Sequence, residues 1–327
     1  MNNFQAGIAA ACIVASSSAQ AFDLQGHRGA RGLAPENTLE GFAVALKIGV
    51  STLELDLGMT RDGVVMVSHD SYLNPDHTRG PDRQFLAGRG PAIRALTLAE
   101  LERYDVGRLK PGTSYAQAFQ DQKGIDGASI PTLAKVFELV KRAKADHVRF
   151  NIETKLEPQS NNDVADPETF AAAVAKEVRD ADLGARVTVQ SFDWRTLAVF
   201  RRIAPEIERS CLTIEMGNRS TVQSGRPGAS PWLGGLDVDD FAGSVPRLVA
   251  AAGCAVWSPL FRDLNSETLG EAKALGLKVI PWTVNEQSDL TRLIGLGVDG
   301  IITDYPDRLR AVMAAKGMTL PPAVTAP

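Results

Sequence analysis

Short apolar runs alternate with longer amphipathic stretches along most of this chain, from about residue 23 onward. This rhythm is typical of strands that alternate with helices, and it predicts βα units around a parallel sheet. The expected strands cover residues 23–27, 52–57, 148–153, 187–190, 208–213, 255–258, 278–282 and 299–303. The expected helices cover residues 38–48, 131–145, 166–182, 193–203, 245–253, 265–275, 286–295 and 306–316. Eight strands with interleaved helices predict an α/β fold, a TIM (β/α)8 barrel.

Local signals support several of the helix boundaries. Thr38 and Asp193 each stand at the start of an expected helix, where a side-chain oxygen can cap the first free N–H groups. Glycines follow four of the expected helices, where a left-handed C-cap favours glycine. These glycines are Gly49, Gly184, Gly276 and Gly297.

The alternation is interrupted after the second strand region, over about residues 71–130, by a stretch rich in glycine, proline, arginine and aspartate. A short helix is expected near residues 97–103. Irregular stretches of this length are uncommon inside a compact domain and are usually functional. On a barrel this stretch leaves the C-terminal face, where active sites lie. We interpret it as an insertion that covers one side of the substrate cleft.

The N-terminal segment differs in kind from the rest, because residues 1–21 carry no charged side chain. An apolar run is followed by Ala19-Gln20-Ala21, which fits the small-x-small pattern of a cleavage site. We expect a signal peptide over 1–21, a barrel domain over 22–317 and a C-terminal tail over 318–327. The run is shorter than a transmembrane helix requires. The expected product is a secreted, periplasmic protein without stable membrane insertion, and its oligomeric state stays open.

Composition and cysteine spacing exclude some classes of partner and of metal or redox chemistry. The 327 residues carry a formal net charge of −4 and no lysine/arginine-rich block, so a nucleic-acid partner is not expected. Cys12 lies in the apolar N-terminal run, and Cys211 and Cys254 remain in the domain. Spacing alone does not place two Cα atoms within bridging distance, so we favour two buried free thiols. The absence of a Cys-x-x-Cys pattern argues against zinc and against dithiol redox chemistry.

Two expected strands carry carboxylates on a face that should point into the barrel. Alternate residues of a strand share a face, so Glu54 and Asp56 point together, and Glu153 points with Asn151 and Lys155. Buried carboxylates repel one another and lose hydration unless a cation lies between them. Glu54, Asp56 and Glu153 therefore predict an oxygen-ligand cage for Mg²⁺, Ca²⁺ or Mn²⁺ rather than for zinc.

Histidines and basic residues accompany the carboxylates at the expected strand ends. His27 and His69 are suited to general acid and base catalysis because an imidazole titrates near neutral pH. Arg28 and Lys155 beside a cation form an anion site, and the cation would polarise a phosphoryl oxygen. These residues indicate metal-assisted phosphoester cleavage in a barrel, without distinguishing a diester from other phosphoesters.

The ordered motifs together resemble the glycerophosphodiester phosphodiesterase family over residues 24–312. The matching segments are His27-Arg28-Gly29-Ala30, Ala34-Pro35-Glu36-Asn37-Thr38, Glu54-Leu55-Asp56, Asp62-Gly63, His69-Asp70, Ile130-Pro131-Thr132-Leu133, Asn151-Ile152-Glu153-Thr154-Lys155, Pro281-Trp282-Thr283-Val284-Asn285 and the run from Gly297 to Pro306. Their common order makes the resemblance more specific than any one motif.

The resemblance implies a TIM barrel with an insertion after the second strand. It implies hydrolysis of a small-molecule glycerophosphodiester to sn-glycerol 3-phosphate and an alcohol with one divalent cation, Ca²⁺ or Mg²⁺. It also implies roles for particular residues: the metal ligands Glu54, Asp56 and Glu153, the acid/base pair His27 and His69, and the phosphate contacts Arg28 and Lys155. Asn37 either faces the substrate or orders the His27 loop, and Trp282 either walls the glycerol end of the cleft or packs in the core.

Two other functions remain open at this level. Phospholipase D-like enzymes that act on sphingomyelin or lysophospholipids also combine such a barrel with two histidines and a carboxylate-bound metal. The segment 35–38 and the motif 151–155 argue against that class. A non-catalytic binding protein for glycerophosphodiesters has no need of an acid/base pair, so His27 and His69 argue against it.

Overall fold

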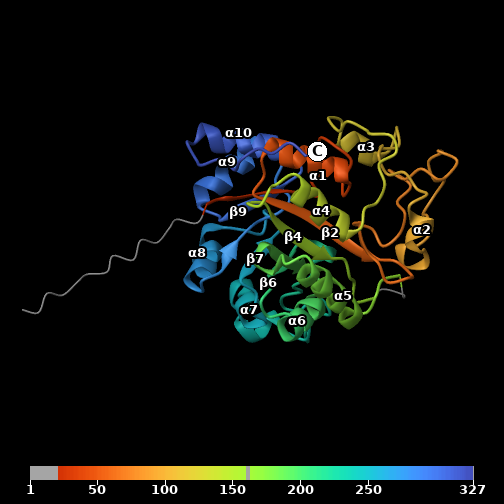
Figure 1. Ribbon diagram of the computed structural model, residues 1–327. Helices are drawn as coiled ribbons and strands as arrows, with labels where there is room; N and C mark the ends of the chain where they lie inside the picture. Colours follow the sequence, from red (N-terminus) through yellow and green to blue (C-terminus); the bar gives the residue numbers. More distant parts are fainter. Residues whose placement is uncertain (1–20, 160–162, 327) are drawn as a thin grey trace, which may run out of the picture.

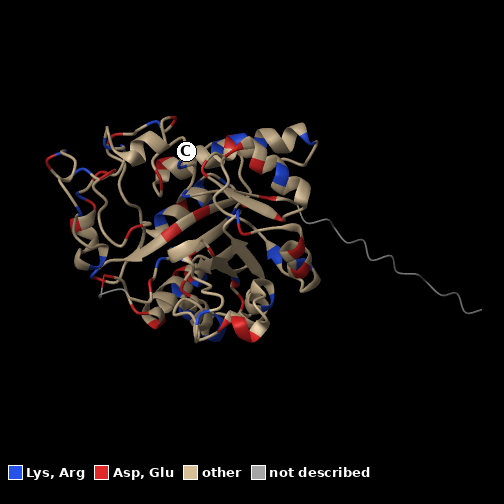
Figure 2. Ribbon diagram, turned by 180° about the vertical axis from the view of Figure 1, so that it is seen from behind, with Lys and Arg blue, Asp and Glu red and all other residues tan. Residues whose placement is uncertain are grey.

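The computed structural model describes residues 21–159 and 163–326, so the expected signal peptide lies outside the described residues except for Ala21. Within these ranges, no helix is both long and apolar enough to cross a membrane. Seen from behind, acidic and basic residues are interspersed over the ribbon (Figure 2).

The described chain forms a TIM barrel, which confirms the predicted fold (Figure 1). Its eight parallel strands are β1 (Asp23–Gly26), β2 (Thr52–Met59), β4 (Arg149–Thr154), β5 (Val187–Ser191), β6 (Glu208–Thr213), β7 (Val256–Pro259), β8 (Lys278–Val279) and β9 (Gly300–Thr303). They are ordered β8-β7-β6-β5-β4-β2-β1-β9. The main-chain N–H of Asp299 donates to the carbonyl of Val279, and that of Ile302 to Pro281, so the two end strands also meet.

Two details of the sheet differ from the expected strands. The strand expected over 278–282 is regular only at Lys278–Val279, because Pro281 has no N–H to donate to a ladder. The short strand β3 (Val65–Val67) was not predicted, and it pairs antiparallel with the end of β2. This pairing extends β2 beyond the barrel toward the insertion.

Helices surround the strands close to their expected positions (Figure 1). They are α1 (Leu39–Ile48), α4 (Leu133–Arg142), α5 (Pro167–Asp180), α6 (Trp194–Ile203), α7 (Val245–Ala252), α8 (Ser266–Ala274), α9 (Gln287–Leu296) and α10 (Pro306–Ala315). Their apolar faces and the outward faces of the strands form one continuous core.

The predicted N-caps are present, and one of the four glycine predictions is wrong. Thr38 accepts from the Gly41 N–H and Asp193 accepts from the Arg195 N–H. Left-handed backbone follows the helices at Gly49, Gly276 and Gly297. Gly184 instead belongs to a 3₁₀ turn over Gly184–Arg186, and Asp182 takes the left-handed conformation after α5, with φ of 55°.

The insertion forms a small lobe beside the barrel, between β3 and α4 (Figure 1). It contains the expected short helix, α2 (Leu98–Leu101), and a second helix, α3 (Ser114–Ala118), which was not predicted. The lobe has its own apolar cluster, formed by Met66, Leu73, Ile93, Leu101, Val106 and Ile130. It also contacts the loop after β1, because Tyr115 donates to Glu36 and the Lys123 N–H donates to the Leu33 carbonyl.

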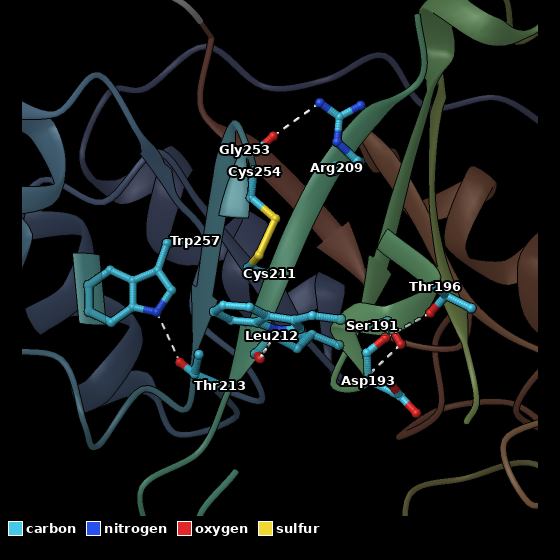
Figure 3. The surroundings of a disulfide bond; sticks show 11 residues. Ser191, Asp193, Thr196, Arg209, Cys211, Leu212, Thr213, Gly253, Cys254 and Trp257 are labelled. Atoms are coloured by element: carbon cyan, nitrogen blue, oxygen red, sulfur yellow. Dashed lines mark hydrogen bonds between the residues drawn. A yellow bond between two sulfur atoms is a disulfide. The ribbon is translucent and has the colours of Figure 1, made fainter. Parts of the chain in front are cut away.

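Cys211 and Cys254 form a disulfide, so the preference for two free thiols was wrong (Figure 3). Cys211 lies on β6 and Cys254 lies just before β7, its parallel neighbour, and this pairing brings the Cα atoms to 5.9 Å. That separation is in the ordinary bridging range. The cysteines are 43 positions apart in the sequence, so the cross-link restricts the unfolded chain and contributes about 4 kcal/mol in the chain-entropy estimate.

The expected C-terminal tail lies against the barrel. The Val324 N–H donates to the Leu46 carbonyl at 2.9 Å, and Arg310 donates to the Pro321 carbonyl at 2.7 Å. Apolar side chains of the tail, including Met318 and Leu320, pack on the core. The segment therefore lies against the C-terminal end of α1 and against α10.

Candidate active site

Three buried carboxylates converge inside the barrel as the alternation of β2 and β4 predicts. Glu54 and Asp56 come from β2 and Glu153 from β4, and the strand register places Asp56 opposite Glu153. One carboxylate oxygen from each residue lies within 4.8 Å of those of the other two. Each side chain is buried, with at most 7% of its residue surface exposed.

The charges in this cluster oppose one another. Burial, and then the neighbouring charge of Asp56, raise the pKa of Glu54 well above its ordinary value. Burial also raises the pKa of Glu153 to about 7, although Lys155 acts in the other direction. Burial opposes ionisation of Asp56 too, but Arg28 and other nearby cationic groups hold its pKa well below the ordinary range. Crowded carboxylates of this kind are the environment that a hard cation stabilises.

A divalent cation fits the residues that are present. Among the described residues, the Asp56 Oδ1 atom is buried without a hydrogen-bond partner. An unpartnered carboxylate oxygen in an all-oxygen cluster is suited to Ca²⁺ or Mg²⁺. Glu54, Asp56 and Glu153 would hold the ion, and Lys155 lies next to them, 2.8 Å from Glu153 and 3.8 Å from Asp56.

His27 follows β1, and a buried carboxylate holds its ring. Its Nδ1 atom lies 2.6 Å from Oδ1 of Asp304, while Nε2 lies 3.9 Å from Oε2 of Glu54. Asp304 also accepts from Arg31 at 2.8 Å and from Asn285 at 2.7 Å. Because a carboxylate accepts at Nδ1, that nitrogen carries the proton, and Nε2 is free to exchange one with a substrate.

A carboxylate also holds the ring of His69, which follows β3. Its Nδ1 atom lies 2.8 Å from Asp70, and Asn74 donates to the second oxygen of Asp70 at 2.6 Å. Burial, together with the charges of Arg28 and Lys155, lowers the pKa of His69 to about 4. Burial and the charge of Arg31 likewise lower the pKa of His27. Both rings are therefore neutral near pH 7 in the protein without ligands.

The loop between β1 and α1 carries Arg28 and Asn37, both with positive φ. The Arg28 main-chain N–H donates to Glu54 at 2.8 Å, and its guanidinium contacts Glu36 at 2.9 Å and Asp56 at 3.1 Å. Asn37 donates to Asp56 at 2.9 Å. Asn37 thus orients a predicted metal ligand, while Thr38 caps the helix.

Several of these side chains line a cavity of about 190 Å³, which shares lining residues with a wider groove of about 780 Å³. His27, Arg28, His69, Glu153 and Lys155 all face the smaller space. Trp282 lines both spaces, donates from its indole to the Ser258 carbonyl at 3.0 Å, and packs edge-on against Phe192. Tyr72 and Arg89 from the insertion line the groove, so the insertion forms part of one wall.

Sequence reasoning missed several residues of this site, and Asp304 and Gln190 make the most direct contacts to predicted site residues. Asp304 lies in the run 297–306 that carried the family resemblance, yet no role was expected for it. Gln190 on β5 donates to Glu54 at 2.9 Å, and no motif pointed to it. The other two histidines do not line the cavity or the groove: His147 is exposed, and half-buried His77 packs near Tyr115.

Comparison with known proteins identifies the family. The model of the Glycerophosphoryl diester phosphodiesterase family matches residues 27–308. A crystal structure of a protein from Silicibacter pomeroyi DSS-3 that bears this family name is 36% identical, with a TM-score of 0.81, and the match covers 92% of this chain and 96% of that one. A glycerophosphodiester phosphodiesterase of Caldanaerobacter subterraneus is 29% identical over 283 residues, which cover 86% of this chain and 94% of the relative.

A more distant structure shares the fold. An Oleispira antarctica phosphodiesterase, solved with its product sn-glycerol-3-phosphate, is 23% identical with a TM-score of 0.63, and the match covers 89% of this chain and 96% of that one. The matched region contains every predicted site residue, from His27 to Trp282. The chain therefore belongs to the glycerophosphoryl diester phosphodiesterase family and is a phosphoric diester hydrolase.

Proposed function

We propose that this enzyme hydrolyses glycerophosphodiesters to sn-glycerol 3-phosphate and an alcohol, with one Ca²⁺ or Mg²⁺ ion and with His27 and His69 as acid and base. The observation that carries the proposal is the meeting of two carboxylate-anchored imidazoles, a three-carboxylate cluster and two cationic side chains in one cavity. The product held by the Oleispira antarctica relative is the glycerol phosphate half of such a diester.

The residues of the cavity divide the chemistry among them. A bound cation would supply Lewis-acid stabilisation of charge on a phosphoryl oxygen. Arg28 and Lys155 bind the phosphate and offset its negative charge. His27 and His69 exchange protons with the attacking hydroxyl and the leaving alkoxide through the ring nitrogens that Asp304 and Asp70 do not occupy. Trp282 and Phe192 exclude water from one side of the substrate.

The test is release of sn-glycerol 3-phosphate from glycerophosphocholine by residues 22–327, first with EDTA and then with added Ca²⁺ or Mg²⁺. We expect chelator to remove activity and one of the two ions to restore it. Full activity in a metal-free protein would refute the cation cage. Cleavage of lysophosphatidylcholine alone would favour the phospholipase D-like alternative, and binding of either compound without turnover would favour a binding protein.

We further propose that the protein is exported and works in the periplasm. The charge-free N-terminal segment and the buried disulfide both fit an oxidising compartment outside the cytoplasm. In a fractionated host, we expect the periplasmic protein to have the mass of a chain that begins at Phe22, with Cys211 and Cys254 resistant to alkylation. Recovery of the full-length chain in the cytoplasm with both cysteines alkylated would contradict export.

A further inference from the structure

A chain of hydrogen-bonded polar side chains runs through the barrel interior below the three carboxylates. Gln190 donates to Glu54 Oε1 at 2.9 Å, and the Asn151 amide nitrogen donates to Gln190 Oε1 at 3.0 Å. The same Asn151 nitrogen donates to Gln25 Oε1 at 2.8 Å, and Gln25 donates to Asp23 Oδ2 at 2.8 Å. The chain thus links β1, β4, β5 and β2, from one end of the barrel to the predicted cation cage.

The two carboxylates determine the direction of every hydrogen bond in this chain. Gln190 and Gln25 donate from their NH₂ groups to Glu54 and Asp23, and this direction is required whenever the two carboxylates are ionised, as a bound cation would require of Glu54. Their amide oxygens then point inward and meet at Asn151. The NH₂ group of Asn151 donates to both oxygens, while its own Oδ1 atom has no hydrogen-bond partner in the described part of the chain.

Burial makes this arrangement hard to relax. Gln25, Asn151 and Gln190 are each at most 3% exposed, although Gln25 and Asn151 line a small cavity of about 40 Å³ and Gln190 lines the cavity of about 190 Å³. An unsatisfied buried donor or acceptor costs about 1–3 kcal/mol. Glu54 is therefore held at Oε1 by Gln190 and at Oε2 by the Arg28 main-chain N–H. These two hydrogen bonds fix the orientation of the Glu54 carboxylate in the protein without a cation.

We propose that Gln190 and Asn151 are positioning residues for the cation cage, Gln190 by orienting Glu54 directly and Asn151 by orienting Gln190. This inference rests on the proposed metal site. Partners that orient a metal ligand raise metal affinity because they fix the ligand geometry in advance, and their loss typically weakens binding about 10- to 100-fold.

Gln190→Met tests the direct contact, because methionine keeps the length of the side chain but donates no hydrogen bond to Glu54. Asn151→Leu removes the hydrogen bond that orients Gln190. This second variant keeps the inference testable if Gln190→Met does not fold. Ser210→Ala is the matched control: Ser210 lies in the same barrel interior, is buried, and its hydroxyl has no hydrogen-bond partner in the described part of the chain.

Calorimetric titration of each purified, metal-free protein with CaCl₂ and with MgCl₂ gives a Kd that does not depend on turnover. For the ion that binds wild type, we expect the Kd of Gln190→Met to be about 10- to 100-fold higher than that of wild type. The Kd of Asn151→Leu should also be higher than that of wild type. Ser210→Ala should keep the wild-type Kd. Circular dichroism checks that each variant is folded.

Wild-type Kd values in folded Gln190→Met and Asn151→Leu would overturn this inference and leave the proposed cage standing. An equal loss of affinity in Ser210→Ala would also overturn it, since any disturbance of the barrel interior would then suffice. A wild-type protein that binds neither ion would overturn the cage itself, and the inference with it.

Discussion

Replacing either His27 or His69 by alanine is expected to lower kcat for glycerophosphocholine by about 10²–10⁴-fold, the usual contribution of a general acid or base. Each ring is anchored at Nδ1 by a carboxylate, with distances of 2.6 Å to Asp304 and 2.8 Å to Asp70. This leaves Nε2 of each ring for the substrate. Because both pKa values are lowered, both rings are neutral near pH 7 in the protein without ligands. The ring that acts as base can then accept the proton of the attacking hydroxyl, and the ring that acts as acid must first take up a proton at Nε2 before it donates one to the leaving alkoxide. Alanine removes either function without replacing a residue of the carboxylate cluster.

His147→Ala is the matched control, because His147 is exposed and does not line the cavity or the groove. Steady-state kinetics with glycerophosphocholine and thermal unfolding of all three variants separate lost chemistry from lost folding. His147→Ala should keep both kcat and the unfolding temperature of the wild type. A His27→Ala or His69→Ala enzyme with near-wild-type kcat would show that the acid/base pair has been assigned to the wrong residues.

The barrel was predictable because its strands are short apolar runs and its helices are amphipathic, and both patterns depend on local spacing alone. The carboxylate cage was predictable for the same reason. Alternate side chains of a strand share a face, so Glu54 and Asp56 had to point together, and β4 beside β2 brought Glu153 to them. The hydrophobic pattern did not predict two very short elements: β3 has three residues and α3 has five.

Long-range pairings account for most of what sequence reasoning missed. Asp304 reaches His27 across 277 residues, and Gln190 reaches Glu54 across 136. Neither contact leaves a local spacing signal, since it depends on which strands become neighbours when the barrel closes. The disulfide has the same origin, because the pairing of β6 with β7 is what brings Cys211 near Cys254.

A Glu153→Gln substitution is expected to weaken cation binding more than about 100-fold. Loss of a residue that only orients a metal ligand typically weakens binding about 10- to 100-fold, and loss of the ligand itself should have a larger effect. Catalysis should fall by about 10³-fold or more, because the Lewis acid contributes several kcal/mol to stabilising the transition state. In the metal-free protein the same change is expected to stabilise the fold. Glutamine keeps an oxygen for Lys155, which donates to Glu153 Oε1 at 2.8 Å, but it removes a charge next to Asp56.

The pH dependence of this stabilisation follows from the raised pKa of Glu153. Burial raises that pKa to about 7, so the folded protein favours the neutral acid while the unfolded chain ionises near its ordinary value of 4.5. Metal-free wild type should therefore lose stability as pH rises from about 4.5 to about 7, by about 3 kcal/mol, and glutamine should not share that loss. The advantage of Glu153→Gln should be small at pH 4.5 and full at pH 8.

Urea unfolding with EDTA at pH 4.5 and pH 8, repeated at pH 8 with the ion that binds wild type, measures both effects. Glu157→Gln is the matched control, because Glu157 lies on the same segment but is exposed and outside the cluster. We expect the ion to stabilise wild type and Glu157→Gln but not Glu153→Gln. If Glu153→Gln were instead less stable than wild type at pH 8 with EDTA, Glu153 would serve mainly as the partner of Lys155. A cation would then not be needed to hold the three carboxylates together.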